Sequence, residues 1–531
     1  MKTFLFAALI LLVTPSLAHA EATISMREVP VAGGRTLAAA ASAPFQLVGL
    51  HWRGRGTVAF RTRSTTGRWS AWRPAAPEAE DLPDASARES ASARGWRLGN
   101  PYWVGSADAI RYRIRGRVSR LRAYFVRSPA DALPVRRVAM AGSPAIVSRL
   151  GWRANEAIRR AGPRYAPAVA FAVVHHTAGS NAYGRAQSPA IVRAIQLYHV
   201  KGNGWDDVGY NFLVDRYGQV FEGRYGGVDR NVVGAHAQGF NAGSVGVAVI
   251  GTYGSAAPPA AAQAALSTLL AWRLDVAHVD PLSTLTWRSG GNARFPTGVP
   301  VFLRAIAGHR DTGFTTCPGS ALYARLGAIA ASVSTLGRPK LYAPSATGDI
   351  GGLIRFRARL SEVRPWTVTV SDPAGAVVAS GSGTSADIDW SWDAAAAPKA
   401  RYGWTISAGD GVRPATGFVG AAPVRLTLTK VSAQPATISP NGDGRADATS
   451  IGYTISASAS VTAVLRSADG TQLAVLFSDR RAPGRHTFRF AADGLPDGRY
   501  DIALTATDAR TTVTASVRVV VDRSVRSILR S

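Results

Sequence analysis

Residues 171–179 read Phe-Ala-Val-Val-His-His-Thr-Ala-Gly, and this stretch decides the fold of the middle of the chain. Its apolar run, Phe171 to His176, is short and predicts a buried strand that ends in two histidines. Strands and helices mix around it from about residue 145 to 335. Apolar patterning and turn residues predict further strands at 210–214, 219–222 and 244–253, and helices at 188–198, 259–278 and 318–333.

The flanking parts of the chain are predicted to be all-β. Residues 21–140 contain several segments rich in β-forming residues, and within them the stretch 74–94 has no apolar period and predicts a surface loop. Residues 340–425 and 426–525 predict two successive β-sandwiches, because the segment that begins at Trp366 resembles the one that begins at Val461. The expected fold class is therefore multidomain.

The first 20 residues resemble a signal peptide. A lysine precedes a short apolar run, and Ala18-His19-Ala20 has the form of a cleavage site. Export follows from this interpretation, so we expect a secreted protein, extracellular or associated with the cell wall. The alternative is an uncleaved membrane anchor, but the apolar run is too short to span a membrane, and we expect no stable membrane insertion.

The chain of 531 residues has a formal net charge of +27. An exported protein rarely meets nucleic acid, so we expect no nucleic acid as partner. Anionic cell-wall polymers are the accessible partners that such a charge would attract. The alternative is that a GC-rich genome enriches arginine, and composition does not decide between these explanations.

Six of the nine histidines and the single cysteine lie in the middle region. Two imidazoles and one thiolate, supplied by His175, His309 and Cys317, would leave one position of a tetrahedral metal open, as catalytic zinc requires. Cys317 is expected to cap the helix 318–333, whose dipole would favour the thiolate. The alternative is two core histidines and a buried cysteine, and spacing alone does not exclude it.

Several motifs in one order carry a family resemblance. They are Val173-Val-His-His-Thr-Ala-Gly179, Tyr198-His199, Gly204-Trp-Asp-Asp-Val-Gly-Tyr-Asn-Phe212, Phe221-Glu-Gly-Arg224, Gly234-Ala-His236, Ser244-Val-Gly-Val247, Gly308-His-Arg-Asp311 and Cys317-Pro-Gly319. With them, residues 148–334, about a third of the chain, resemble the peptidoglycan recognition protein family and the related N-acetylmuramoyl-L-alanine amidases. The resemblance implies an α/β domain at 145–335, with a mixed sheet flanked by helices and Zn²⁺ at one end of a cleft.

The resemblance also implies roles for individual residues. His175, His309 and Cys317 match the zinc ligands, and Tyr210 and Thr315 match catalytic positions beside the metal. An intact ligand set implies a zinc-dependent amidase that cuts between N-acetylmuramic acid and L-alanine. The alternative is a non-hydrolytic peptidoglycan-binding protein.

Further matched positions imply a groove that binds the muramyl-peptide. They are His176, Thr177, His199, His236 and Asn241, and the pair Gly204 and Trp205, which resembles the choice that favours meso-diaminopimelate stems. The two C-terminal β regions look like bacterial immunoglobulin-like modules, for which we expect a spacing or wall-attachment role.

Overall fold

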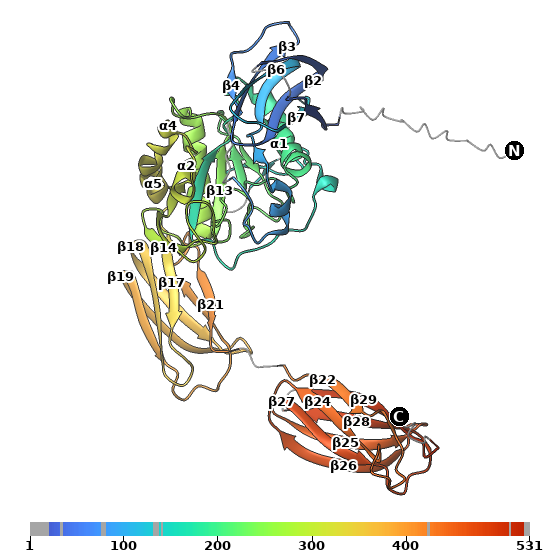
Figure 1. Cartoon of the computed structure of the whole chain (residues 1–531). Coiled ribbons are helices and arrows are strands. Elements are labelled where there is room, and N and C mark those ends of the chain that lie inside the picture. The colour runs from blue at the N-terminus through green and yellow to red at the C-terminus, as the bar shows by residue number, and fades with distance from the viewer. Residues whose placement is uncertain are drawn as a thin grey trace, which may run out of the picture.

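The computed structural model describes residues 21–31, 36–75, 81–130, 137–139, 142–421, 425–508 and 511–524 (Figure 1). The predicted signal peptide, residues 1–20, lies outside them. Among the described residues, no helix is long and apolar enough to cross a membrane.

The N-terminal part is a seven-stranded sheet, as the all-β prediction required. Its order is β1-β7-β2-β6-β3-β4, and β5 also pairs with β2. These strands are β1 (Thr23–Val29), β2 (Thr36–Arg53), β3 (Thr57–Ser64), β4 (Arg73–Pro74), β5 (Arg97–Leu98), β6 (Tyr102–Arg115) and β7 (Arg120–Arg127). Between β4 and β5 the chain forms a short 3₁₀ helix, η1 (Arg88–Ala93).

The middle part contains a second seven-stranded sheet of mixed direction, in the order β16-β10-β13-β11-β12-β9-β8. Its strands are β8 (Arg137–Val138), β9 (Ile146–Val147), β10 (Phe171–His176), β11 (Phe212–Val214), β12 (Val220–Glu222), β13 (Ser244–Val249) and β16 (Ile306–Gly308). The strands predicted around residues 171, 210, 219 and 244 are thereby confirmed. A hairpin, β14 (Thr284–Arg288) and β15 (Pro300–Arg304), forms a separate two-stranded sheet.

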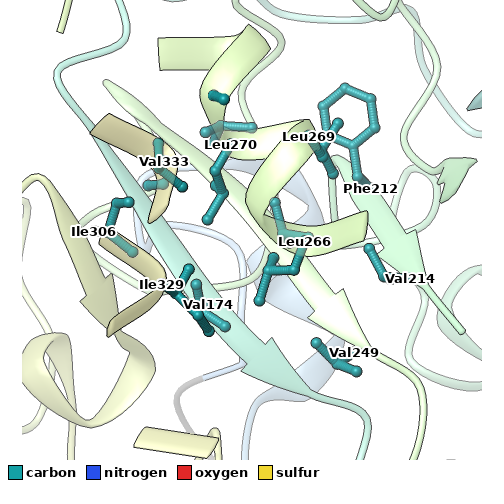
Figure 2. Packing of buried hydrophobic residues seen from close by; sticks show 14 of the residues in the cluster. Val174, Phe212, Val214, Val249, Leu266, Leu269, Leu270, Ile306, Ile329 and Val333 are labelled. Carbon is teal, nitrogen blue, oxygen red and sulfur yellow. The ribbon is translucent and has the colours of Figure 1, made fainter. Parts of the chain in front are cut away.

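Helices pack on this sheet. The long helix α2 (Ala260–Val276) and α5 (Leu326–Thr335) bury Leu266, Leu270 and Ile329 against Val174 of β10 (Figure 2). Helix α1 (Ser188–Leu197) continues into the π-helical turn η4 (Tyr198–Gly202) and belongs to another buried cluster. Short 3₁₀ turns, η2 (Glu156–Ile158) and η3 (Arg185–Gln187), complete this region.

The predicted helix 318–333 is wrong as a single helix. It is divided into α4 (Ser320–Tyr323) and α5, and a four-residue helix, α3 (His309–Thr312), precedes them. Gly319, with a positive φ of 88°, is the residue that caps α4. Cys317 therefore does not cap a long helix.

The N-terminal sheet and the middle domain share one buried cluster. Leu47, Trp103 and Tyr124 of the sheet pack with Ile195 and Tyr198 of the middle domain. The Tyr198 hydroxyl also donates a hydrogen bond to the Gly99 carbonyl at 2.6 Å. The connection between β4 and β5 also lies against the middle domain, where Leu82 and Trp96 pack on Trp205.

The C-terminal parts are all-β. Strands β17 (Leu341–Thr347), β18 (Leu353–Ser371), β19 (Val377–Asp393), β20 (Tyr402–Ser407) and β21 (Ala415–Val419) form one five-stranded sheet. The last part has a three-stranded sheet of β22 (Leu428–Gln434), β24 (Ala448–Ile455) and β27 (Gly484–Ala491). Its five-stranded sheet contains β23 (Thr437–Ile438), β25 (Ala459–Ser467), β26 (Gln472–Arg481), β28 (Gly498–Thr507) and β29 (Thr512–Val521). Each of the two parts encloses its own apolar core.

Candidate metal centre

Two neighbouring parallel strands bring the predicted histidine ligands together. Strands β10 and β16 are paired with Val174 opposite Gly308, so the next residues, His175 and His309, follow at the same edge of the sheet. The carboxyl ends of parallel strands are where α/β sheets bind ligands. The fold thus explains how residues far apart in the sequence meet.

Cys317 completes the set from the loop between α3 and α4. Its Sγ lies 3.8 Å from Nδ1 of His175 and accepts a hydrogen bond from the His176 amide at 3.3 Å. The sulfur also lies 3.8 Å from the carbonyl oxygen of His176. The Thr315 hydroxyl accepts a hydrogen bond from the Cys317 amide at 3.0 Å, which fixes the loop.

The three side chains fit a zinc ion. One ligand atom from each of His175, His309 and Cys317 lies within 4.8 Å of the others, and all three residues are fully buried. Burial lowers the pKa of His175 to about 3, so its imidazole is neutral, which is the form that binds a metal. Two nitrogens and one sulfur are the donor set of catalytic zinc sites with three protein ligands.

His236 holds His175 in place. Its Nδ1 lies 3.1 Å from Nε2 of His175, so the other ring nitrogen of His175, Nδ1, faces the sulfur of Cys317. The backbone amide of His236 donates to the Asn241 side chain at 2.7 Å. Such partners fix the tautomer and orientation of a metal-binding histidine. The resemblance did not predict this contact, because it placed His236 among the groove residues.

A carboxylate from the N-terminal part also reaches the centre. Asp81 Oδ1 lies 3.1 Å from Nδ1 of His175 and 3.4 Å from Nδ1 of His309. Burial raises the pKa of Asp81 to about 6, against the opposing effects of His309 and of the Tyr210 hydroxyl. Asp81 falls in the predicted surface loop 74–94, and that prediction is wrong here, since the residue is only 8% exposed.

Tyr210 lies where the resemblance placed it. Its ring centroid is 5.4 Å from that of His175, and its hydroxyl donates to Asp81 Oδ2 at 3.2 Å. A phenolic hydroxyl at this position can donate a hydrogen bond to an oxyanion that forms beside the metal ligands.

The residues predicted to line the groove gather around the same centre, and several already have protein partners. Nδ1 of His176 accepts from the Tyr253 amide, the Thr177 hydroxyl accepts from the Gly251 amide, and Nδ1 of His199 accepts from the Gly209 amide, at 3.2, 3.0 and 3.1 Å. Gly204 has a positive φ of 75°. The His199 ring lies against Trp205, with 4.5 Å between ring centroids.

Residues 81–98, here named segment 81–98, cover two of the predicted groove residues, Trp205 and Asn241. Leu82, Trp96 and Leu98 pack on Trp205 and Ala235. As a result Trp205 is only 3% exposed and Asn241 is fully buried. The sequence did not predict this cover, because the stretch 74–94 has the pattern of a surface loop.

Comparisons with known proteins identify relatives of the N-terminal and middle parts of the chain. The profile of the family described as N-acetylmuramoyl-L-alanine amidase matches residues 165–320, and that described as Rv3811 N-terminal galactose-binding domain-like matches residues 13–139. Peptidoglycan-recognition protein SC2 of Drosophila simulans is 33% identical over 178 residues, which are 34% of this chain and 82% of that protein. Peptidoglycan recognition protein 1 of Bos taurus is 34% identical over 179 residues, 34% of this chain and 80% of that protein.

Solved structures match the same region. Drosophila PGRP-LB is 26% identical, with a TM-score of 0.27, over 34% of this chain and 91% of that one. Human PGRP-IβC in complex with glycosamyl muramyl pentapeptide is 27% identical, with a TM-score of 0.27, over 35% of this chain and 95% of that one.

The middle domain is thus an α/β domain with a two-histidine, one-cysteine candidate metal centre. The sequence relatives show the family: the chain belongs to the peptidoglycan recognition protein and type 2 amidase family.

Proposed function

We propose that the chain is a zinc-dependent N-acetylmuramoyl-L-alanine amidase. The observation that carries the proposal is the convergence of His175, His309 and Cys317 on one buried point. Binding of peptidoglycan alone would not require three metal ligands, whereas hydrolysis of an amide does benefit from them. The substrate would be the muramyl-peptide of peptidoglycan, the polymer after which the Drosophila and bovine relatives are named.

The protein's own residues would act as follows. His175, His309 and Cys317 hold Zn²⁺, whose chemistry is to polarise the scissile carbonyl and to activate water. Tyr210 donates a hydrogen bond to the oxyanion. His236 orients His175, and Thr315 acts through Cys317 by accepting its amide hydrogen bond. The remaining predicted groove residues would hold the stem peptide and glycan.

Export to the cell wall is part of the proposal. The N-terminal 20 residues support it through their resemblance to a signal peptide, and the charge of +27 supports attraction to anionic wall polymers. The two C-terminal β parts would be immunoglobulin-like spacers or attachment modules.

Metal analysis combined with mass spectrometry of digested peptidoglycan tests the proposal. We expect one zinc per chain, and release of stem peptides that stops on chelation and returns with added zinc. The Asp81→Asn variant belongs in the same assay, because Asp81 lies against two of the ligands in the wild-type chain. If both proteins bind peptidoglycan but neither releases peptides, the chain is a non-hydrolytic binding protein instead.

A further inference from the structure

Segment 81–98 enters the candidate site with two of its carboxylates, Asp81 and Glu89, buried. Asp81 and Glu89 are 8% and 3% exposed, although loops between strands usually keep carboxylates in water. Removing a carboxylate from water costs several kcal/mol unless a charge or several hydrogen bonds compensate. The contacts of Asp81 and Glu89 therefore show which groups of the middle domain compensate their burial.

The middle of the segment is held by an ion pair between Glu89 and Arg224. Both carboxylate oxygens of Glu89 accept from the Arg224 guanidinium at 2.9 Å, and Oε2 also accepts from the Asp206 amide at 2.7 Å. Arg224 is itself only 8% exposed. A buried, bidentate pair of this kind has a defined geometry, unlike an exposed one.

Near its start, the segment takes the hydrogen bonds of a predicted groove residue, Asn241. The Asn241 amide group donates to the Leu82 carbonyl at 3.0 Å and to Asp84 Oδ1 at 2.8 Å. The Gly239 backbone amide donates to the same Asp84 oxygen at 2.8 Å. A muramyl-peptide and segment 81–98 would therefore compete for Asn241.

The near end is Asp81. Oδ2 accepts from Tyr210, while Oδ1 accepts no hydrogen bond from any described residue, although it is buried. In a tetrahedral zinc site the nitrogen–oxygen edges are about 3.3 Å, from bond lengths of about 2.0–2.1 Å. Two of the edges that a fourth ligand would make, from Oδ1 to Nδ1 of His175 and to Nδ1 of His309, are 3.1 and 3.4 Å and match this value.

We propose that segment 81–98 is a built-in inhibitor of the amidase site, in which Asp81 supplies the fourth ligand of the metal and the rest of the segment fills the groove. The inference rests on the proposed function. Asp81 takes the position that water needs, and Tyr210 donates to its carboxylate in place of an oxyanion. Activity then requires the segment to leave, while the N-terminal sheet can remain packed through the apolar cluster it shares with the middle domain.

The test uses the full chain with Co²⁺ in place of Zn²⁺, because the visible spectrum of Co²⁺ reports its ligands. Wild type is compared with Asp81→Asn and Asp81→Ala, and with Asp108→Asn as the matched control. Asp108 is also an N-terminal-domain carboxylate, but it pairs with Arg63 at 2.9 Å and is part of neither the site nor segment 81–98. Each protein is titrated with azide, a small anion that binds an open cobalt position.

We expect azide to change the spectra of both Asp81 variants at concentrations at least ~10-fold lower than it needs for wild type or Asp108→Asn. With zinc bound, both Asp81 variants should also bind a soluble muramyl-peptide more tightly than wild type or Asp108→Asn does, as measured by calorimetry. Equal azide responses in wild type and in both Asp81 variants would overturn the assignment of Asp81 as a ligand. Equal muramyl-peptide affinities would overturn the occlusion of the groove.

The two proposals fail in different ways. An Asp81→Asn protein whose cobalt responds to azide, and which binds muramyl-peptide without cutting it, would refute the amidase but support the inhibitor. Hydrolysis by wild type at the rate of both Asp81 variants, with equal azide responses, would refute the inhibitor but support the amidase.

Discussion

Replacing Glu89 by glutamine perturbs segment 81–98 without touching the metal ligands. The change removes the charge that faces Arg224 and turns one of three accepted hydrogen bonds into a donor facing a donor. Loss of one partner of a buried ion pair costs about 3–5 kcal/mol. Taking the lower value, at about 1.4 kcal/mol per factor of ten, the equilibrium between docked and undocked segment shifts roughly 100-fold towards undocked.

Hydrogen exchange of the Gly239 amide measures this shift. That amide donates to Asp84, which lies between Asp81 and Glu89 in the sequence, and not to Glu89. If the segment leaves as a unit, Glu89→Gln accelerates exchange at Gly239 roughly 100-fold, and Asp108→Asn leaves it unchanged. Acceleration at Asp206, whose amide donates to residue 89 itself, is expected in any case.

The decisive comparison is therefore between the two amides. Faster exchange at Asp206 with wild-type exchange at Gly239 would show that the contacts of Asp84 open independently of Glu89. That result would refute the reasoning that segment 81–98 docks and undocks cooperatively.

Four other perturbations test the metal centre, the segment and the core. His175→Ala removes a fully buried ligand, so zinc measured by mass spectrometry should fall below stoichiometric amounts while the circular dichroism spectrum stays that of the wild type. Tyr210→Phe, made in the Asp81→Asn background so that the site is open, should lower kcat for muramyl-peptide by about 10²-fold and leave zinc content unchanged. Burial raises the pKa of Glu89, but the Arg224 charge, its hydrogen bonds and the Asp206 amide outweigh this and lower the pKa below 4.5. Docking is therefore stabilised above pH 4.5 and weakens as the pH falls further, so exchange of the Gly239 amide, corrected for its intrinsic pH dependence, should accelerate there in wild type but not in Glu89→Gln. Leu270→Ala empties a fully buried position in the core of Figure 2 and should destabilise the middle domain by about 2–5 kcal/mol in urea unfolding, with an unchanged transition contradicting the packing.

The candidate ligands were predicted through the family resemblance, since spacing alone did not exclude two core histidines and a buried cysteine, and the structure shows that the three side chains lie together. The apolar run that ends in His175 forms β10, and the motif with His309 follows β16, so strand pairing alone brings the two imidazoles together. The order of the other motifs was not needed for this step. Only the direction and adjacency of the strands were needed, and the family resemblance implied both.

The break between α4 and α5 could not be predicted in this way. Ala324 and Arg325 favour helix, so local propensity supports a continuous helix through them. The structure instead anchors α4 through the Tyr253 carbonyl, which accepts from the Ala321 and Leu322 amides at 3.1 and 3.3 Å. A tertiary contact of this kind leaves no periodic signal.

Segment 81–98 was missed for a related reason. Its composition is that of a loop, and its anchoring contacts are made with residues of another domain. The resemblance covers only the middle domain, where it identified Asn241 and Trp205 as groove residues but could not show what covers them. No spacing in the sequence relates Asp81 to the ligands.

The two buried carboxylates of the segment differ in what compensates their burial. Glu89 has the Arg224 guanidinium, whereas Asp81 faces His175, whose imidazole burial keeps neutral, the His309 imidazole and one tyrosine hydroxyl. A divalent ion between His175, His309 and Cys317 would supply the charge that Asp81 lacks. By linkage, metal binding and segment docking would then strengthen each other by the same free energy. A protein inhibited in this way would bind its metal most tightly while it is inactive. When the segment leaves, the metal would gain an open coordination position and its affinity for the protein would fall.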